Sequence, residues 1–171
     1  GAVRNPDGQV FMKNRETDEW LEQNEKATRN FIRKWGHFCK HDSLMKPIIP
    51  SKYDIGFILK DNNIDLVRAL EPWCSTLYCD TQLGRHYITT EQPNTILDLS
   101  KRVKPYNSEK QNEILIKIDG TKFTQQDFSY IQQLPEILKD SGEIGTFELG
   151  SLSIDVIQMN IYEKELIICE H

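Results

Sequence analysis

The side chains best placed for chemistry are three aspartates at the ends of predicted strands: Asp54, Asp80 and Asp119. Asp54 enters a short apolar run, whereas Asp80 and Asp119 each follow one. In an open parallel sheet, ligands bind beyond the carboxyl ends of the strands, and a carboxylate there can hold ribose hydroxyls. Asp80 comes 24 residues after Gly56, near the spacing between a glycine turn and a ribose-binding acid. The pattern allows a nucleoside or S-adenosylmethionine pocket.

The same positions also have a purely structural interpretation. Gly56 lies inside the predicted strand rather than after it, and the next residues, ILKDNN, contain no glycine-rich phosphate loop. Aspartates at strand ends commonly form turns and cap helices. The candidate ligand-binding residues are therefore Asp54, Gly56, Asp80, Asp119 and Gly120, with turn formation and capping as the alternative role.

Patterns for metal binding and nucleophilic catalysis are weak or missing. His37 and His41 have the i, i+4 spacing that lets two imidazoles share a zinc ion on a helix, but no second ligand pair accompanies them. The sequence contains no D-x-D, G-x-S-x-G, G-x-x-x-x-G-K-[ST] or H-E-x-x-H pattern. We therefore expect solvated histidines, no metal site and no cofactor.

The four cysteines are Cys39, Cys74, Cys79 and Cys169, and none forms C-x-x-C. Cys74 and Cys79 flank a predicted strand, and a spacing of five puts them on opposite faces of one strand. We expect buried, reduced thiols that do not bond to each other. Reduced cysteines are typical of intracellular proteins, so the predicted location is cytoplasmic.

Composition limits the class of protein further. The 171 residues carry 21 Lys and Arg against 26 Asp and Glu, a net charge of −5 that is unfavourable for a nucleic-acid partner. No run of 18 apolar residues exists, so we expect no membrane span. The N-terminal residues lack the apolar segment of a signal peptide. Because the sequence begins with Gly rather than Met, we expect a fragment of a longer polypeptide.

The first region of the chain is dominated by one predicted helix, residues 17–39, with Thr17 as N-cap. Its apolar stripe consists of Trp20, Leu21, Ala27, Phe31, Ile32, Trp35 and Phe38. Arg29, Arg33 and Lys34 are expected on the other faces, and Gly36 is a weak point near which the helix can end. Prolines 47 and 50 indicate a linker, so we divide the chain into a lead-in with helix, 1–46, and a domain, 47–171.

In the second region, predicted strands and helices alternate. The expected strands are 53–60, 75–79, 86–89, 113–118, 146–149 and 151–158. A turn at 81–85 precedes the third of these strands. The expected helices are 64–70, 94–103 and 125–139, the last interrupted by Pro135. The alternation predicts an α/β fold: a Rossmann-like three-layer sandwich with a mostly parallel sheet and an antiparallel final pair, preceded by a long N-terminal amphipathic helix.

Residues 17–36, TDEWLEQNEKATRNFIRKWG, resemble the C-terminal tail of GT-A-type family 2 glycosyltransferases. In many of these enzymes, a helix of pattern N…F-x-x-KWG follows the catalytic domain. The matching residues are Asn24 or Asn30, then Phe31, Lys34, Trp35 and Gly36. The preceding VRNPDGQVFM is similar to the stretch that leads into that helix, so the resemblance covers about residues 1–36.

The resemblance implies a function without catalytic residues in this chain. Such enzymes hold the nucleotide-sugar through a metal-binding D-x-D motif and use an upstream carboxylate as base, and neither is present here. The expected function is a non-catalytic accessory region of a nucleotide-sugar-dependent glycosyltransferase in glycan biosynthesis. Its expected partner is an upstream catalytic domain, or a second copy bound through the N-terminal helix. The alternatives are a protein-interaction module using helix 17–39 and a Rossmann-like S-adenosylmethionine-dependent methyltransferase relative.

Overall fold

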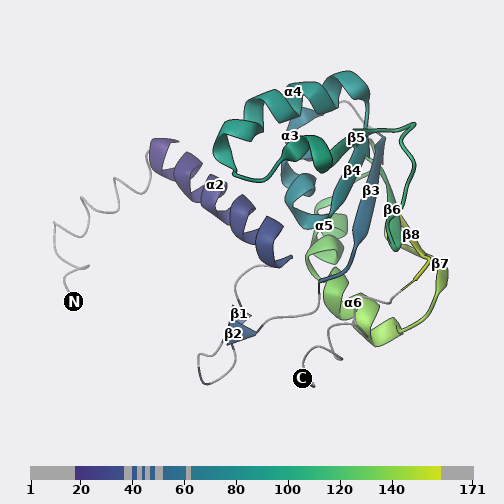
Figure 1. Cartoon of the computed structure of the whole chain (residues 1–171). Helices are drawn as coiled ribbons and strands as arrows, with labels where there is room; N and C mark the ends of the chain where they lie inside the picture. The colour runs from purple at the N-terminus through teal and green to yellow at the C-terminus, as the bar shows by residue number, and fades with distance from the viewer. Residues whose placement is uncertain are drawn as a thin grey trace, which may run out of the picture.

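The chain forms a mixed α/β fold, described by a computed structural model and drawn in Figure 1. The structure describes residues 18–36, 40–41, 44, 47–48, 52–60 and 63–158. Side chains of the first helix are described from residue 23 onward.

Six strands form one sheet in the order β5-β4-β3-β6-β8-β7. They are β3 (Ile55–Lys60), β4 (Thr76–Cys79), β5 (Val103–Pro105), β6 (Ile114–Asp119), β7 (Gly145–Leu149) and β8 (Leu152–Val156). The first four strands in this order are mutually parallel, whereas β8 runs antiparallel to both β6 and β7. The sheet is therefore mostly parallel, and the predicted final antiparallel pair is confirmed.

The helices are α2 (Asp18–Trp35), α3 (Ile64–Leu70), α4 (Thr81–Glu91), α5 (Gln125–Gln132) and α6 (Leu134–Ser141). Three 3₁₀ turns, η2 (Glu71–Trp73), η3 (Gln92–Asn94) and η4 (Leu99–Lys101), and a small antiparallel pair, β1 (Lys40–His41) with β2 (Pro47–Ile48), complete the described elements. α2 ends at Trp35, before the predicted end at 39, because Gly36 adopts a left-handed conformation with φ 81°. Among the described helices, none combines the length and apolarity needed to cross a bilayer.

One face of the sheet carries the core, and the helices pack against it. On β3, the side chains of Ile55, Phe57 and Leu59 are buried on this face, whereas their pleat neighbours Ile58 and Lys60 are half-buried and exposed. The same alternation continues on β6 and β8. The described residues thus form two layers, which corrects the expected three-layer sandwich. The connection from β5 to β6 contains no helix, so it adds no helical layer to the other face.

Two local predictions are wrong. The predicted turn and strand at 81–89 are helix α4, because the Asp80 carboxylate caps it by accepting hydrogen bonds from the backbone N–H groups of Gln82 and Leu83 at 3.0 and 3.2 Å. The predicted helix at 94–103 is replaced by η4 and β5. Ile96, which gave that segment its amphipathic pattern, is fully exposed.

The interruption of the last predicted helix is confirmed. Pro135 lies in the first turn of α6, where its missing N–H costs no hydrogen bond, and the chain divides there into α5 and α6. Gly142 ends α6 with φ 59°. These helices cover the β6 and β8 side of the core through Ile131, Leu134 and Leu138, which are buried.

Cys74 and Cys79 are free thiols that both belong to the core. The prediction that they occupy opposite faces of one strand is wrong, because Cys74 precedes β4 and the strand alternation does not reach it. Burial raises the pKa of the Cys79 thiol to about 11 and that of Cys74 further still. Thiolate, the reactive form, is therefore scarce at both positions at neutral pH.

We expect both thiols to resist alkylation in the native protein, because burial blocks access and suppresses ionisation. The experiment uses a variant with Cys39→Ser and Cys169→Ser, so that only Cys74 and Cys79 are counted. Iodoacetamide labelling should be slow in buffer and rapid in denaturing urea. Rapid labelling of either cysteine without denaturant would contradict the packing described here.

Candidate functional site

The junction between α2 and the rest of the fold is built from charged side chains. We call this set the ion cluster; its members are Arg29, Arg33, Glu71, Glu91 and Arg102. The exposed fraction is 2% for Arg33, 2% for Glu91 and 0% for Glu71. Charged side chains are almost never buried to this extent unless they are paired.

Pairing inside the ion cluster is extensive. The Arg33 guanidinium donates to Glu71 Oε1 at 2.7 Å and to Glu91 Oε2 at 2.9 Å. Arg29 binds Glu91 through two nitrogens, at 2.5 and 2.9 Å. Arg102 donates to the second oxygen of Glu71 at 3.0 Å. Each buried carboxylate is therefore held by two arginines, and α2, η2, α4 and the start of β5 are tied together.

The predicted positions of Arg29 and Arg33 on α2 are wrong, whereas that of Lys34 is confirmed. The sequence predicts Arg29 and Arg33 away from the apolar stripe, yet they face the domain on either side of Ile32. Lys34 is exposed. An i, i+4 arginine pair is the signal in the sequence, but its carboxylate partners lie 38 to 62 residues away along the chain.

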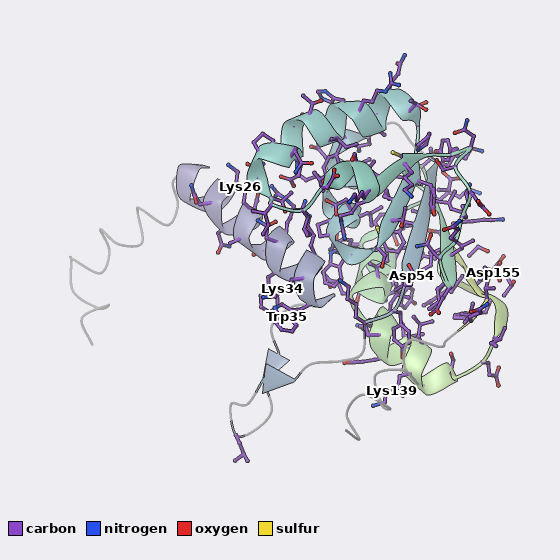
Figure 2. All side chains as sticks on the ribbon, in the orientation of Figure 1. Lys26, Lys34, Trp35, Asp54, Lys139 and Asp155 are labelled. Carbon is purple, nitrogen blue, oxygen red and sulfur yellow. The ribbon has the colours of Figure 1, made fainter. Side chains whose placement is uncertain are left out.

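The opposite side of α2 presents the residues of the N…F-x-x-KWG pattern. Phe31, Lys34 and Trp35 lie across the helix axis from the Arg29–Arg33 row. The Phe31 and Trp35 ring centroids are 6.4 Å apart, and the Lys34 ammonium lies 5.0 Å from the Trp35 ring. Trp35 is 37% exposed, and Figure 2 shows it with Lys34 at the C-terminal end of α2, away from the sheet.

The five candidate ligand-binding residues divide between two ends of the sheet. Asp80 follows β4 and Asp119 ends β6, so both lie at the carboxyl edge of the parallel strands. Asp54 and Gly56 lie near the amino end of β3, and Asp54 is labelled in Figure 2. The structure therefore does not bring the three aspartates together. A single nucleoside pocket made from all three is not formed.

At the carboxyl edge, the candidates act in turns and caps. Asp80 caps α4, and Asp119 accepts hydrogen bonds from the backbone N–H and the hydroxyl of Thr121 at 3.0 and 2.7 Å. These bonds lower the pKa of Asp119. The Gly120 N–H donates to the Lys60 carbonyl at 3.1 Å. This end of the sheet matches the alternative structural interpretation.

At the amino end, Asp54 lines a cavity of about 590 Å³, which we call the polar pocket, and Gly56 lies beneath the Asn112 side chain of that pocket. Its lining residues are Asp54, Thr76, Tyr78, Lys104, Ser108, Glu109, Gln111 and Asn112. The side chain of Asn112 donates to Asp54 Oδ1 at 2.7 Å and accepts from the Tyr78 hydroxyl at 2.7 Å. Sequence reasoning missed Asn112, because it lies in an irregular segment without a motif.

The structure shows no metal centre in the part of the chain that it describes. No group of three or more His, Cys, Asp or Glu side chains within those residues is arranged to hold a metal ion. His41 lies in β1, and His37 lies outside the described residues.

Comparison with known proteins gives no relative from which to transfer a function. The sequence matches no protein-family model, no curated protein and no solved structure. Functional inference for this chain therefore depends on the contacts described above.

Replacing Arg33 by Met should lower the free energy of unfolding by about 3–5 kcal/mol, because it leaves buried carboxylates with too little positive charge. The matched control is Arg68→Met, which removes an exposed ion pair to Asp65 and should cost at most about 1 kcal/mol. Urea unfolding monitored by circular dichroism measures both variants. Equal losses for the two variants would show that the ion cluster does not hold α2.

The ion cluster should also make stability depend on pH. Burial raises the pKa of Glu91, but hydrogen bonds from Arg29, Asn94 and Arg33 lower it by more, to about 2. Because this pKa lies below the ordinary value of 4.5, the stabilisation is present above pH 4.5 and is lost as the pH falls towards 2.

The measurement compares the unfolding free energy of the wild type and Glu91→Gln across this acidic range. Other carboxylates titrate in both proteins, so the difference between the two curves isolates Glu91. We expect the wild-type advantage to shrink as the pH falls below 4.5. A difference that stays constant would contradict the role given to this carboxylate.

Proposed function

We propose that this chain is a non-catalytic accessory region of a nucleotide-sugar-dependent glycosyltransferase, and that α2 connects it to the catalytic domain. One observation carries the proposal: α2 has two functional sides. The Arg29–Arg33 side belongs to the ion cluster. The other side presents Lys34 and Trp35, which are residues of the pattern that follows family 2 catalytic domains.

The exposed side of α2 has the character of an interface. A tryptophan supplies a large apolar area, and a lysine stacked over its ring adds a cation–π contact that strengthens when water is removed. A cavity of about 520 Å³ lies beside it, between Asn30 and Lys34 of α2 and residues 93–97. Ile96 and Leu97 are exposed next to this cavity. Clustered apolar exposure of this kind is typical of protein-interaction sites.

The proposed occupant of this surface is the catalytic domain that precedes the tail helix in family 2 glycosyltransferases. α2 would then be fixed on one side by the ion cluster and on the other by the catalytic domain. It would set the orientation of the catalytic domain relative to the α/β fold of this chain. A second copy of this chain, or an unrelated partner, is the alternative occupant. The free Cys74 and Cys79 thiols support a cytoplasmic location for the assembly.

A second candidate function has one observation in its favour. The parallel strands β5-β4-β3-β6 have the order found in the first half of Rossmann-like folds, which places a topological switch point between β3 and β6. S-adenosylmethionine or a nucleotide would bind there, at the carboxyl edge. Asp80 and Asp119 are already engaged in capping and turn contacts at that edge, so we rank this function second.

The test of the proposal uses Trp35→Ala and Lys34→Ala in two settings. In the chain alone, both variants should keep their unfolding free energy within about 0.5 kcal/mol, since these residues lie on the surface. In a polypeptide that carries this chain behind a family 2 catalytic domain, they should reduce sugar transfer or its thermal stability. Thr89→Ala, an exposed change on α4, is the control in both settings.

Three results would overturn the proposal. The first is nucleotide-sugar turnover by the purified chain alone, which would show that it is catalytic. The second is identical transfer and stability for Trp35→Ala and the Thr89→Ala control in the longer polypeptide. The third is a thermal shift of the chain with S-adenosylmethionine, which at about 100 times its Kd would add about 2.7 kcal/mol and favour the second candidate function.

A further inference from the structure

The polar pocket lies on the face of the sheet opposite the described helices and has the features of a ligand-binding site, and we infer that it binds a neutral, hydroxyl-rich small molecule of the saccharide class. It involves no residue of α2 and lies at the amino end of β3 and β4. The inference goes beyond the proposed function and does not depend on it.

The floor of the polar pocket is rigid and polar. Asn112 keeps 7% of its exposure, and its amide nitrogen donates to Asp54 Oδ1 at 2.7 Å and to the Thr76 hydroxyl at 3.2 Å. Its amide oxygen accepts from the Tyr78 hydroxyl at 2.7 Å. Every polar atom of this side chain is therefore fixed, and it fixes the carboxylate of Asp54 in turn.

Gly56 makes this arrangement possible. A Cβ atom at position 56 would lie 2.5 Å from the Asn112 side-chain oxygen, closer than any real contact allows. Because Gly56 has no side chain, the Asn112 side chain can lie against the backbone of β3 at this position. Glycine often occurs inside a strand where another group must approach the backbone closely.

The rim of the pocket offers matched donors and acceptors. Asp54 Oδ2 takes no hydrogen bond from the described residues, and Glu109 adds a second carboxylate. The hydroxyl of Ser108 and the ammonium of Lys104 supply donors, and the amide of Gln111 donates to Glu109 Oε2 at 3.4 Å. Planar carboxylates and amides with nearby hydroxyls are the groups that pair with the vicinal hydroxyls of a sugar, each of which donates and accepts.

Size and charge narrow the class of ligand. A volume of about 590 Å³ is in the range of small-molecule sites. The lining carboxylates Asp54 and Glu109 are balanced by the ammonium of Lys104 and by that of Lys110 beside Tyr78, which fits a ligand without net charge. The one aromatic ring in the lining, Tyr78, is 2% exposed and has the Lys110 ammonium 5.0 Å from its centroid, so it is unavailable for stacking a base.

Saturation-transfer NMR on the whole chain tests the inference, with glucose, N-acetylglucosamine and maltose as probes. Glycine and uridine monophosphate are the comparison ligands for zwitterionic and anionic chemistry. We expect binding of at least one sugar, weakened about tenfold or more by Asp54→Asn, because a hydrogen bond to a charged acceptor is lost. Asp54→Asn keeps an oxygen for the Asn112 amide, so the fold should be retained, as circular dichroism will show.

Two further variants complete the design. Glu109→Gln on the rim should weaken the same sugar, whereas Asp65→Asn, an exposed carboxylate on α3 outside the pocket, should not. Lack of sugar binding up to the solubility limit would overturn the inference. So would sugar binding that Asp54→Asn and Asp65→Asn change equally, or binding of glycine or the nucleotide in place of sugars.

Discussion

The pairing of two buried glutamates with three arginines is the constraint on which the rest of this structure depends. Glu71 ends α3 and Glu91 ends α4, so both carboxylates are carried to one point by helices that cross over the sheet. An ionised carboxylate in a dry interior is tolerated only when cations and hydrogen bonds replace its water. α2 supplies two of those cations, and the domain needs α2 in order to bury its own acids.

The ion cluster makes α2 part of the fold, although the sequence suggests a separate helix before a linker. An amphipathic helix that precedes a linker can be taken for an appendage, held by an apolar stripe and easily removed. Here Ile32 is its one apolar side chain that is buried among those described, and charged groups make the specific contacts. Buried ion pairs select one geometry more strongly than apolar contacts do, because a shifted register leaves charges unpaired. α2 is therefore an integral, oriented part of the fold.

Some elements of this fold can be predicted from the sequence, and others cannot. β3, α3 and β6 were predictable, since their signals are local: a β-branched run, an i, i+3, i+4 pattern, and a turn pair at Asp119. α4 is not predicted because residues 86–89, HYIT, are mostly aromatic and β-branched and favour a strand. The burial of Arg33 and the position of Asn112 were beyond local reasoning. Both depend on partners that are tens of residues away in the chain, and only the folded structure shows which residues these partners are.

The ion cluster also affects the order in which the chain can fold during its synthesis. α2 is synthesised before its carboxylate partners, because Glu71 follows Arg33 by 38 residues and Glu91 follows Arg29 by 62. Until α4 has left the ribosome, Arg33 has only Glu71 to bind, and Arg29 lacks its partner Glu91. The complete set of ion pairs on α2 can therefore form only after α4 has been synthesised. Because closing contacts over 38 to 62 residues is slower than forming a helix, we expect α2 to dock after it has formed.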